Sequence, residues 1–217
     1  AFNDDLAKKH SGQKIESGNC LTCHAAHASK NAKLLVNLHD PVKSGDCAAC
    51  HDLGEGAKKF SVKGAANEVC LACHSKIREQ MAKDKSTHAP AKQGLCVKCH
   101  APHGSNESWF LSKASGDLCL DCHKPSAGEK STHQPYQNRD CILCHRGHGS
   151  PSPRLLRAAE SELCLRCHKK ENFKGSTVHP PVEDNCMNCH QPHTSNNTKL
   201  LTQPPPALCQ NCHDDKK

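Results

Sequence analysis

Every cysteine in this chain belongs to one repeated motif, Cys-x-x-Cys-His, and this motif limits what the chain can fold into. The 217 residues include 18 Cys and 18 His, and no cysteine falls outside the motifs. The nine motifs are Cys20/Cys23/His24, Cys47/Cys50/His51, Cys70/Cys73/His74, Cys96/Cys99/His100, Cys119/Cys122/His123, Cys141/Cys144/His145, Cys164/Cys167/His168, Cys186/Cys189/His190 and Cys209/Cys212/His213. Cysteine at this density in a short chain indicates covalent cross-links or metal sites.

The spacing within each motif favours covalent haem attachment. Two thiols on one helical turn can form thioether bonds with the two vinyl groups of a haem, and the next histidine then lies beneath the iron as proximal ligand. Zinc ribbons need no histidine after each pair, and nine pairs would leave one unmatched. A disulfide scaffold has no use for the histidines, and thioredoxin-like pairs need a βαβ setting that is absent here. The motifs therefore predict nine covalently bound c-type haems.

The remaining histidines match the number of sixth coordination positions. They are His10, His27, His39, His88, His103, His133, His148, His179 and His193. The match predicts bis-histidine ligation at every iron; the alternative is that some of these side chains lie on the surface or bond haem propionates. A histidine three residues after a proximal histidine, such as His103, is expected to reach another haem in its own pair or the next one. Met81 and Met187 are not expected to be ligands.

The motifs recur every 22 to 27 residues, which is typical of an array of like units. A longer repeat runs His-x-Pro, Cys-x-x-Cys-His-x-x-His-x-Ser, an apolar pair, and a second Cys-x-x-Cys-His. We predict one array over residues 1–217, with a half-unit at 10–35 and paired-haem repeats at 39–74, 88–123, 133–168 and 179–213. The first repeat is degenerate, because Gly54 replaces the fourth-position histidine and Ser61-Val62 replaces the apolar pair.

The composition indicates that porphyrins rather than side chains form the core. Aromatic residues are 3% of the chain and the mean hydropathy is −0.73, so side chains alone would bury too little surface to offset the entropy of ordering. We expect an elongated, mostly irregular, haem-scaffolded fold with short α-helices, little or no β-structure and no conventional hydrophobic core. Short helices are expected within 67–76, 161–169 and 206–213, each ending in a haem-binding histidine.

Charge and hydropathy bear on the partners. The net charge of +7 comes from basic residues scattered singly or in pairs, which suits haem propionates better than nucleic acid. No apolar run approaches the ~20 residues of a membrane span. The chain begins at Ala1 without an initiator methionine, so we expect a secretory leader to have been removed and the location to be periplasmic or extracellular.

Closed irons and dense haems point to electron transfer rather than catalysis. A six-coordinate bis-histidine iron has no open position for substrate, so the chain is not expected to be an enzyme. With so few residues per haem, the porphyrins must pack close together. Three hypotheses remain: an electron carrier or conduit component, a subunit that polymerises into a conductive filament, and a nitrite- or hydroxylamine-converting oxidoreductase, which would need an open iron.

The repeat resembles the doubled Cys-x-x-Cys-His multihaem cytochromes over residues 10–213. Its last unit, His179 to His213, is also similar to the periplasmic decahaem cytochromes of outer-membrane porin–cytochrome conduits. The resemblance implies respiratory or extracellular electron transfer in bacteria or archaea. It also implies redox partners such as other cytochromes or a porin–cytochrome conduit, and in some relatives assembly of copies of the chain into filaments.

Overall fold

A computed structural model describes residues 2–10, 20, 24, 36–54, 60–126 and 129–213. The chain divides into two compact units. The first unit comprises Ala1–Ala49 and His100–Ser112, and the second comprises Cys50–Cys99 and Lys113–Lys217. Two of the predicted site residues, Cys23 and His27, lie outside the described residues. The single array over residues 1–217 stays a prediction.

The described part of the first unit contains short helices and one small antiparallel ladder. Its helices are α1 (Phe2–Lys9), α2 (Asp40–Ser44) and the 3-10 turns η3 (Cys47–Ala49) and η6 (Ser108–Phe110). Strand β1 (Asn37–Leu38) pairs with β3 (Gly104–Ser105), with Asn37 opposite Ser105. Helix α2 begins directly after His39 and carries a proline in its first turn, where a missing N–H costs nothing.

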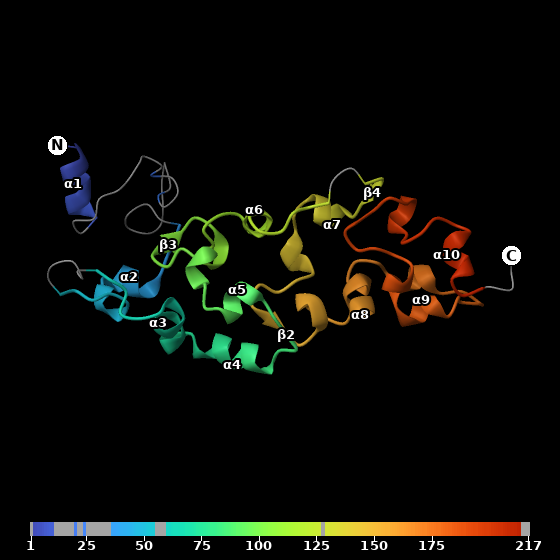
Figure 1. Ribbon diagram of the computed structural model, residues 1–217, viewed down its shortest axis with the longest axis horizontal. Helices are drawn as coiled ribbons and strands as arrows, with labels where there is room; N and C mark the ends of the chain where they lie inside the picture. The colour runs from blue at the N-terminus through green and yellow to red at the C-terminus, as the bar shows by residue number, and fades with distance from the viewer. Residues whose placement is uncertain are drawn as a thin grey trace. The chain divides into compact units, whose positions relative to one another are not determined.

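The second unit repeats the same short elements, separated by loops (Figure 1). Its α-helices are α3 (Ala66–Cys73), α4 (Ser75–Lys83), α5 (Ala89–Lys92), α6 (Ser115–Leu120), α7 (Gln134–Gln137), α8 (Glu160–Leu165), α9 (Pro181–Asp184) and α10 (Ala207–Gln210). Its 3-10 turns are η5 (Cys96–Lys98), η7 (Cys141–Leu143), η8 (Pro153–Leu155), η9 (Lys170–Phe173), η10 (Cys186–Asn188) and η11 (Thr198–Leu200). Helices α3, α8 and α10 fall at the three places where the sequence predicts short helices.

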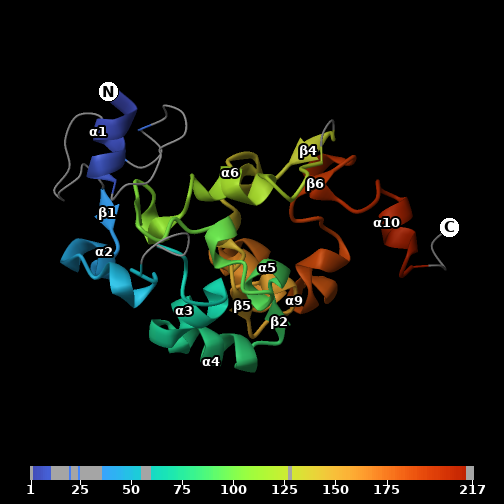
Figure 2. The same cartoon turned by 60° about the vertical axis from the view of Figure 1, so that its left-hand side comes forward.

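Two antiparallel ladders in the second unit connect successive repeats. Strand β2 (Ser86–Thr87) pairs with β5 (Gly149–Ser150), and β4 (Ser131–Thr132) pairs with β6 (Thr194–Ser195). Figure 2 shows β4 and β6 side by side. In each ladder the strand before a His-x-Pro segment joins the strand after the fourth-position histidine of the following repeat. The same connection continues one residue further, because the His133 N–H donates to the His193 carbonyl over 2.8 Å.

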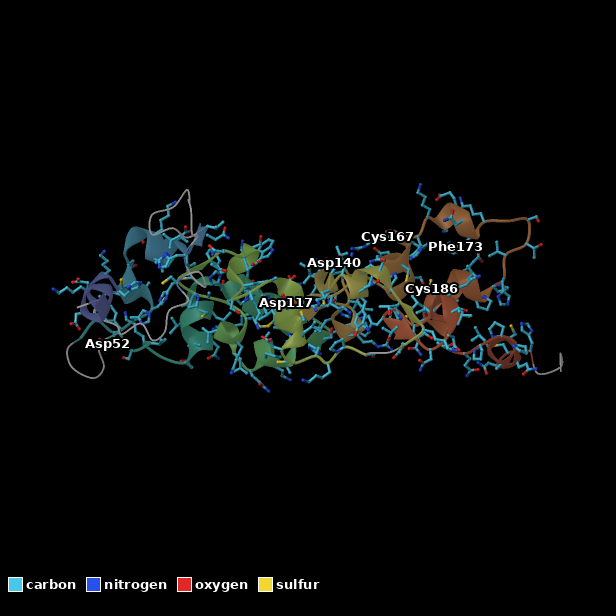
Figure 3. The ribbon with its side chains drawn as sticks, turned by 90° about the horizontal axis from the view of Figure 1, so that it is seen from above. Asp52, Asp117, Asp140, Cys167, Phe173 and Cys186 are labelled. Carbon is cyan, nitrogen blue, oxygen red and sulfur yellow. The ribbon has the colours of Figure 1, made fainter. Side chains whose placement is uncertain are left out.

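The described residues have almost no apolar core, as the composition predicts. Ala158 is the one buried hydrophobic residue among them, and Trp109 is 78% exposed. The polypeptide exposes 16062 Å², whereas a globular chain of its mass would expose roughly 9,800 Å². Side chains stand out from the ribbon of the second unit instead of gathering at a centre (Figure 3). The fold is therefore an irregular scaffold of short helices with little β-structure.

Serine occupies the buried positions that a globular protein would fill with apolar side chains. The serine of each His-x-Ser segment that the structure describes is at most 3% exposed: Ser105, Ser150 and Ser195. Each of these hydroxyls donates to the carbonyl of the second residue of the apolar pair and accepts a backbone N–H two residues further along the chain. A buried hydroxyl is stable when its hydrogen bonds are satisfied, so this serine closes the loop between the two motifs of a repeat.

Candidate functional site

The two motifs of each repeat adopt different local structures. The first motif of a repeat lies on a 3-10 turn, as in η7 and η10, whereas the second lies on an α-helix, as in α6 and α8. In seven motifs, the histidine N–H donates to the carbonyl of the first cysteine over 2.8 to 3.1 Å: His24, His74, His123, His145, His168, His190 and His213. This bond closes one helical turn, which is the geometry that covalent haem attachment requires.

The proximal histidine of each first motif is held by a backbone carbonyl nine residues further along the chain. The Nδ1–carbonyl distance is 2.7 Å for His51 and Phe60, 2.9 Å for His100 and Trp109, 3.0 Å for His145 and Arg154, and 2.9 Å for His190 and Lys199. A hydrogen bond from Nδ1 fixes the tautomer and the ring direction, and Nε2 is then the nitrogen suited to bind a metal.

The carbonyl that holds each of these histidines belongs to a residue with left-handed backbone. Phe60, Trp109, Arg154 and Lys199 have φ values of 62°, 61°, 56° and 57°. Each such residue costs about 1 to 2 kcal/mol relative to right-handed backbone. A β-bridge two residues later, such as His145 with Leu156, fixes the turn. Bridges also join His51 with Val62, so the degenerate first repeat keeps the same frame.

Among the described residues, five pairs of histidine rings lie opposite each other with nearly equal distances between their centroids. The ring centroids are 6.2 Å apart for His10 and His24, 6.0 Å for His88 and His123, 6.1 Å for His133 and His168, 6.0 Å for His145 and His193, and 6.0 Å for His179 and His213. An imidazole nitrogen binds a transition metal at about 2.0 Å and lies about 1.1 Å from its ring centre, so two axial ligands place their centroids about 6.2 Å apart. These residues therefore fit a bis-histidine haem iron.

Histidines of the His-x-Pro segments face the second motif of their own repeat. This holds for His88 with His123, for His133 with His168 and for His179 with His213, at ring angles of 22°, 19° and 25°. Each of the first two histidines caps a helix whose first turn contains proline, which fixes the approach of the ring.

The fourth-position histidine of the last repeat faces the preceding repeat. His193 lies against His145, the first proximal histidine of repeat 133–168. This corrects the expectation, stated above for its counterpart His103, that such a histidine reaches its own pair or the next one. The ladder between β4 and β6 explains why His193 faces the preceding repeat. The ladder ends at His193, so it places the His193 ring beside that repeat. Burial lowers the pKa of His193, helped by His145 and His133, so its imidazole is neutral and able to bind metal. Tyr136 stacks on the His193 ring, with the ring centroids 4.7 Å apart.

The single motif of the half-unit lies beside the histidine that precedes it. The fourth position of repeat 39–74 is Gly54, which has no side chain that could bind a metal. His10 lies against His24. In the last three repeats, the histidine before the first motif faces the second motif. The half-unit has only one motif, and the histidine before it faces that motif.

His190 differs from the other first-motif histidines. Among the described residues no aromatic or histidine ring lies against it, although its Nδ1 hydrogen bond to Lys199 and its bridge to Leu201 are intact. It is exposed, whereas His51, His100 and His145 are partly buried. The proximal side of this site is therefore formed, and no described histidine supplies the other axial side.

Cysteines of consecutive repeats lie against each other in the second unit. The thiols of Cys70 and Cys96, Cys119 and Cys141, and Cys164 and Cys186 are hydrogen-bonded. Burial and the neighbouring thiol raise the pKa of Cys119 and of Cys164 to about 11. The thiols of Cys99 and Cys144 likewise have their pKa raised by burial and then by Cys122 and Cys167, within their own repeats. Attachment sites that follow each other in sequence are therefore neighbours in space.

The nine motifs look alike in sequence, but their cysteines differ in exposure, and the last motif stands apart. Among the motifs whose two cysteines are both described, only this one has both exposed, Cys209 and Cys212. Its backbone turn is nevertheless formed, because the Cys212 N–H donates to the Cys209 carbonyl over 3.2 Å. Haem attachment at this last motif stays a prediction from the sequence. The second cysteine is exposed in all four second motifs: Cys73, Cys122, Cys167 and Cys212.

Close backbone packing keeps the junctions between repeats tight. A Cβ on Gly116, in α6, would lie 2.5 Å from the Arg139 Cβ, and Asp117 of the same helix forms an ion pair with Arg139. At the equivalent position of the next junction, the Ser161 hydroxyl donates to the Asp184 carbonyl over 2.9 Å.

Disulfides and clusters of metal-ligating side chains do not occur among the described residues. Their cysteines are all free of disulfides, and no group of three or more His, Cys, Asp or Glu residues is arranged to hold a metal ion in the described part of the chain. None of the described helices has the length and hydrophobicity to cross a membrane.

The sequence pattern of the doubled CXXCH motif family matches residues 13–37, 39–79, 88–128, 133–173 and 179–217. The chain belongs to this family. The four longer matches begin at His39, His88, His133 and His179, where the His-x-Pro repeats begin. The family's motifs are those of multihaem c-type cytochromes, so the chain carries covalently bound c-type haems and transfers electrons, and covalent haem attachment indicates an extracytoplasmic protein. A comparison with curated proteins gives no match.

Sequence reasoning missed three parts of the site. These are the carbonyls that hold the proximal histidines, the buried serines, and Tyr136 on His193. A signal for the first was present, because the residue before the apolar pair stands nine positions after the histidine in each complete repeat.

Proposed function

We propose that this chain conducts electrons along nine closely packed bis-histidine c-type haems, in respiratory or extracellular electron transfer. The observation that carries the proposal is the contact between successive attachment sites in the second unit, together with the facing histidine rings. Attachment sites that touch through their thiols leave no room for insulating protein between neighbouring porphyrins.

The residues have separate roles in this proposal. The cysteines hold each porphyrin, and the proximal histidines bind iron from one side. The remaining histidines close the other side, and a closed iron changes little in geometry between its ferric and ferrous forms, which suits electron transfer. We therefore propose a carrier or conduit component, located in the periplasm or outside the cell, and not an enzyme. Its partners are other redox proteins, including cytochromes of a porin–cytochrome conduit.

The repeated Nδ1 hydrogen bonds also bear on redox tuning. A hydrogen bond to a backbone carbonyl makes the histidine a stronger electron donor to the iron, which favours the ferric state and lowers the potential. Four first-motif histidines share this bond, so their haems should have low potentials.

Haem counting tests the proposal. We expect the intact mass of the holoprotein to correspond to nine covalent haems, and a reductive titration to take up nine electrons per chain. We also expect electrons delivered at one haem to equilibrate over all of them. A lower haem count, or a group of haems that exchanges no electrons with the rest, would contradict the proposal.

A further inference from the structure

We infer that three arginines make the first haem of the third repeat the most easily reduced of the four first-motif haems, so that electrons collect there. The arginines are Arg146, Arg157 and Arg166, and the haem is the one held by Cys141 and Cys144. This inference rests on the proposed function and deepens it, because it names the place in the array where electrons are held.

The third repeat has its own set of cations. Residues 133–168 contain five arginines and no lysine, whereas the rest of the chain contains lysines and a single arginine. Two of the five form short ion pairs, Arg139 with Asp117 and Arg154 with Glu160. The other three stand one, twelve and twenty-one residues after the first proximal histidine of the repeat. These three, and not the paired ones, lie at the first motif.

Arg157 is bound to the attachment motif by two hydrogen bonds. Its backbone N–H donates to the Cys144 carbonyl over 2.9 Å, and its Nε donates to the Ile142 carbonyl over 2.5 Å. Ile142 stands between the two cysteines of the motif, so the guanidinium is held at the place of attachment. No carboxylate forms an ion pair with Arg157 within the described part of the chain. Its positive charge is therefore not offset by the polypeptide there.

Arg146 directly follows the proximal histidine His145. Its backbone N–H donates to the Leu155 carbonyl over 2.8 Å, and its side chain is partly buried. The Nε of this side chain is buried and has no hydrogen-bond partner among the described residues. A buried charged donor needs an acceptor, and a haem propionate is a carboxylate of the kind that guanidinium groups bind. The orphaned donor therefore fits the haem of its own motif.

Arg166 adds a third charge, from the C-terminal end of helix α8. Burial and then Cys167 raise the pKa of the Cys144 thiol. The charges of Arg157 and Arg166 lower the same pKa, because they favour the thiolate. Glu162 lies 3.6 Å from Arg166, but both side chains are exposed, so this ion pair is weak. The charge of Arg166 therefore acts at the Cys144 attachment site.

The other repeats do not have three cations at these positions. The equivalents are Asp52, Lys63 and Ala72 in the first repeat, Ala101, Ser112 and Asp121 in the second, and Gln191, Thr202 and Asn211 in the fourth. In the second repeat the pKa of Cys99 is raised by burial, by Cys122 and then by Asp121. Lys113 pairs with Asp121 over 2.7 Å, so this position brings no net positive charge. The charge at the first motif thus changes sharply between successive repeats.

Positive charge favours the reduced state of a haem. Each reduction takes one electron from a partner redox protein and changes the iron from ferric to ferrous, which lowers the positive charge by one. A guanidinium stays protonated and therefore disfavours the ferric state. One charge at roughly 10 Å changes such an equilibrium constant about tenfold in the effective dielectric of a protein. Tyr136, stacked on His193, adds to the effect, because covering the site also disfavours its charged form. The Nδ1 hydrogen bond is common to all four first-motif histidines and does not distinguish them.

Haem deletion measures the potential of each first-motif haem. Subtracting the redox titration of a variant without one haem from that of the wild-type holoprotein gives the midpoint of the deleted haem. Cys141→Ala with Cys144→Ala should give the highest midpoint of the four. Cys96→Ala with Cys99→Ala is the matched deletion in the second repeat, and its midpoint should be lower by about tenfold or more in electron affinity, or about 59 mV. A higher midpoint for any of the other three haems would overturn the inference.

Exchanging the arginines tests their charges. Arg146→Gln, Arg157→Thr and Arg166→Asn together give the third repeat the residues of the fourth. The electron affinity of its first haem should fall more than about tenfold, with the haem count unchanged. Arg157→Thr alone should lower it by about threefold, because the side chain is exposed. Arg139→Gln also removes one charge from this repeat, and it should have a smaller effect because Arg139 pairs with Asp117. Equal shifts in these two single variants would show that only net charge matters.

Lysine at the same three positions separates charge from packing. Arg146→Lys, Arg157→Lys and Arg166→Lys keep three positive charges, and the midpoint should stay within about threefold of the wild type in electron affinity. A fall as large as that of the neutral variant would show that the charges are not the cause, and the inference would be wrong.

These results are separate from those that test the proposed function. The haem count and the electron uptake establish or contradict the nine-haem array whatever the order of its potentials. A full complement of haems with the highest first-motif midpoint elsewhere would contradict the role of the arginines alone.

Discussion

The third repeat, 133–168, and the fourth, 179–213, have nearly the same pattern of motifs but different surroundings. Both first-motif histidines have an Nδ1 hydrogen bond, of 3.0 Å for His145 and 2.9 Å for His190, and both form a bridge to a leucine. Within the described residues only His145 of these two has a histidine facing it, and that histidine comes from the following repeat. The third repeat thus builds its own proximal frame, whereas the histidine that faces its first proximal histidine comes from the following repeat.

Removing a haem from the third repeat should have the largest effect on stability. Cys141→Ala with Cys144→Ala deletes a porphyrin that neighbours sites on both sides, and losing a large buried group costs about 4 kcal/mol or more, or about 10 °C in Tm for a chain of this length. Thermal unfolding measures the loss. The same change at Cys186 and Cys189 should cost less, because His190 is exposed and no ring faces it among the described residues. Equal losses at both places would contradict the comparison.

Truncating His193 should convert the third repeat into a copy of the fourth. His193→Ala removes the ring that faces His145, so the variant should have one more high-spin iron that binds carbon monoxide than the wild type. Gln191→Ala is a suitable control in the same loop, because the Gln191 backbone bond to Leu200 is kept. An unchanged ligand-binding stoichiometry in His193→Ala would show that His193 serves no iron of the third repeat.

The ladders β2–β5 and β4–β6 should differ in stability when the residue at one equivalent position is exchanged between them. Gly149 in β5 and Thr194 in β6 hold equivalent positions, but a Cβ at Gly149 would lie 2.4 Å from the Asp84 carboxylate and 3.2 Å from the Ser86 carbonyl. Gly149→Thr should therefore cost about 2 kcal/mol of unfolding free energy. Thr194→Gly should cost less than about 1 kcal/mol, mainly through backbone entropy. Denaturant unfolding of the holoprotein distinguishes the two, and a tolerated Gly149→Thr would contradict the packing of β2 on β5.

The buried serines should show the smallest effect. Ser150→Ala leaves the Leu156 carbonyl and the Ser152 N–H without the hydroxyl that satisfies them, which should cost about 1.5 kcal/mol. Ser152→Ala changes a less buried neighbour and should fall within about 0.5 kcal/mol of the wild type. Equal costs in the two variants, by the same unfolding measurement, would show that burial of Ser150 is not what stabilises the loop.

Much of this architecture could be predicted from the sequence, because it is local. The local sequence around three second motifs predicted the short helices α3, α8 and α10. The low mean hydropathy predicted the near absence of an apolar core among the described residues. The direction of His193 could not be predicted, because it depends on a ladder between segments more than 60 residues apart. The positive-φ turns at Trp109, Arg154 and Lys199 were equally hidden, because these residues are poor indicators of left-handed backbone.

The degenerate first repeat shows that backbone bonds tolerate sequence change better than ligand positions do. Ser61-Val62 looks unlike the apolar pairs, yet the bridge between His51 and Val62 and the Phe60 carbonyl on His51 keep the frame. Backbone bonds define the frame, so the side chains can vary. Gly54 is different, because a ligand needs its own side chain, and glycine has none.

The most direct test of the ligand register is an electron-density map of the holoprotein around the haem attached to Cys141 and Cys144. The register predicts that the iron is bound by His145 from one side and by His193, from the following repeat, on the other. A map with His193 bound to the haem of its own repeat, or with any other sixth ligand at this iron, would contradict it.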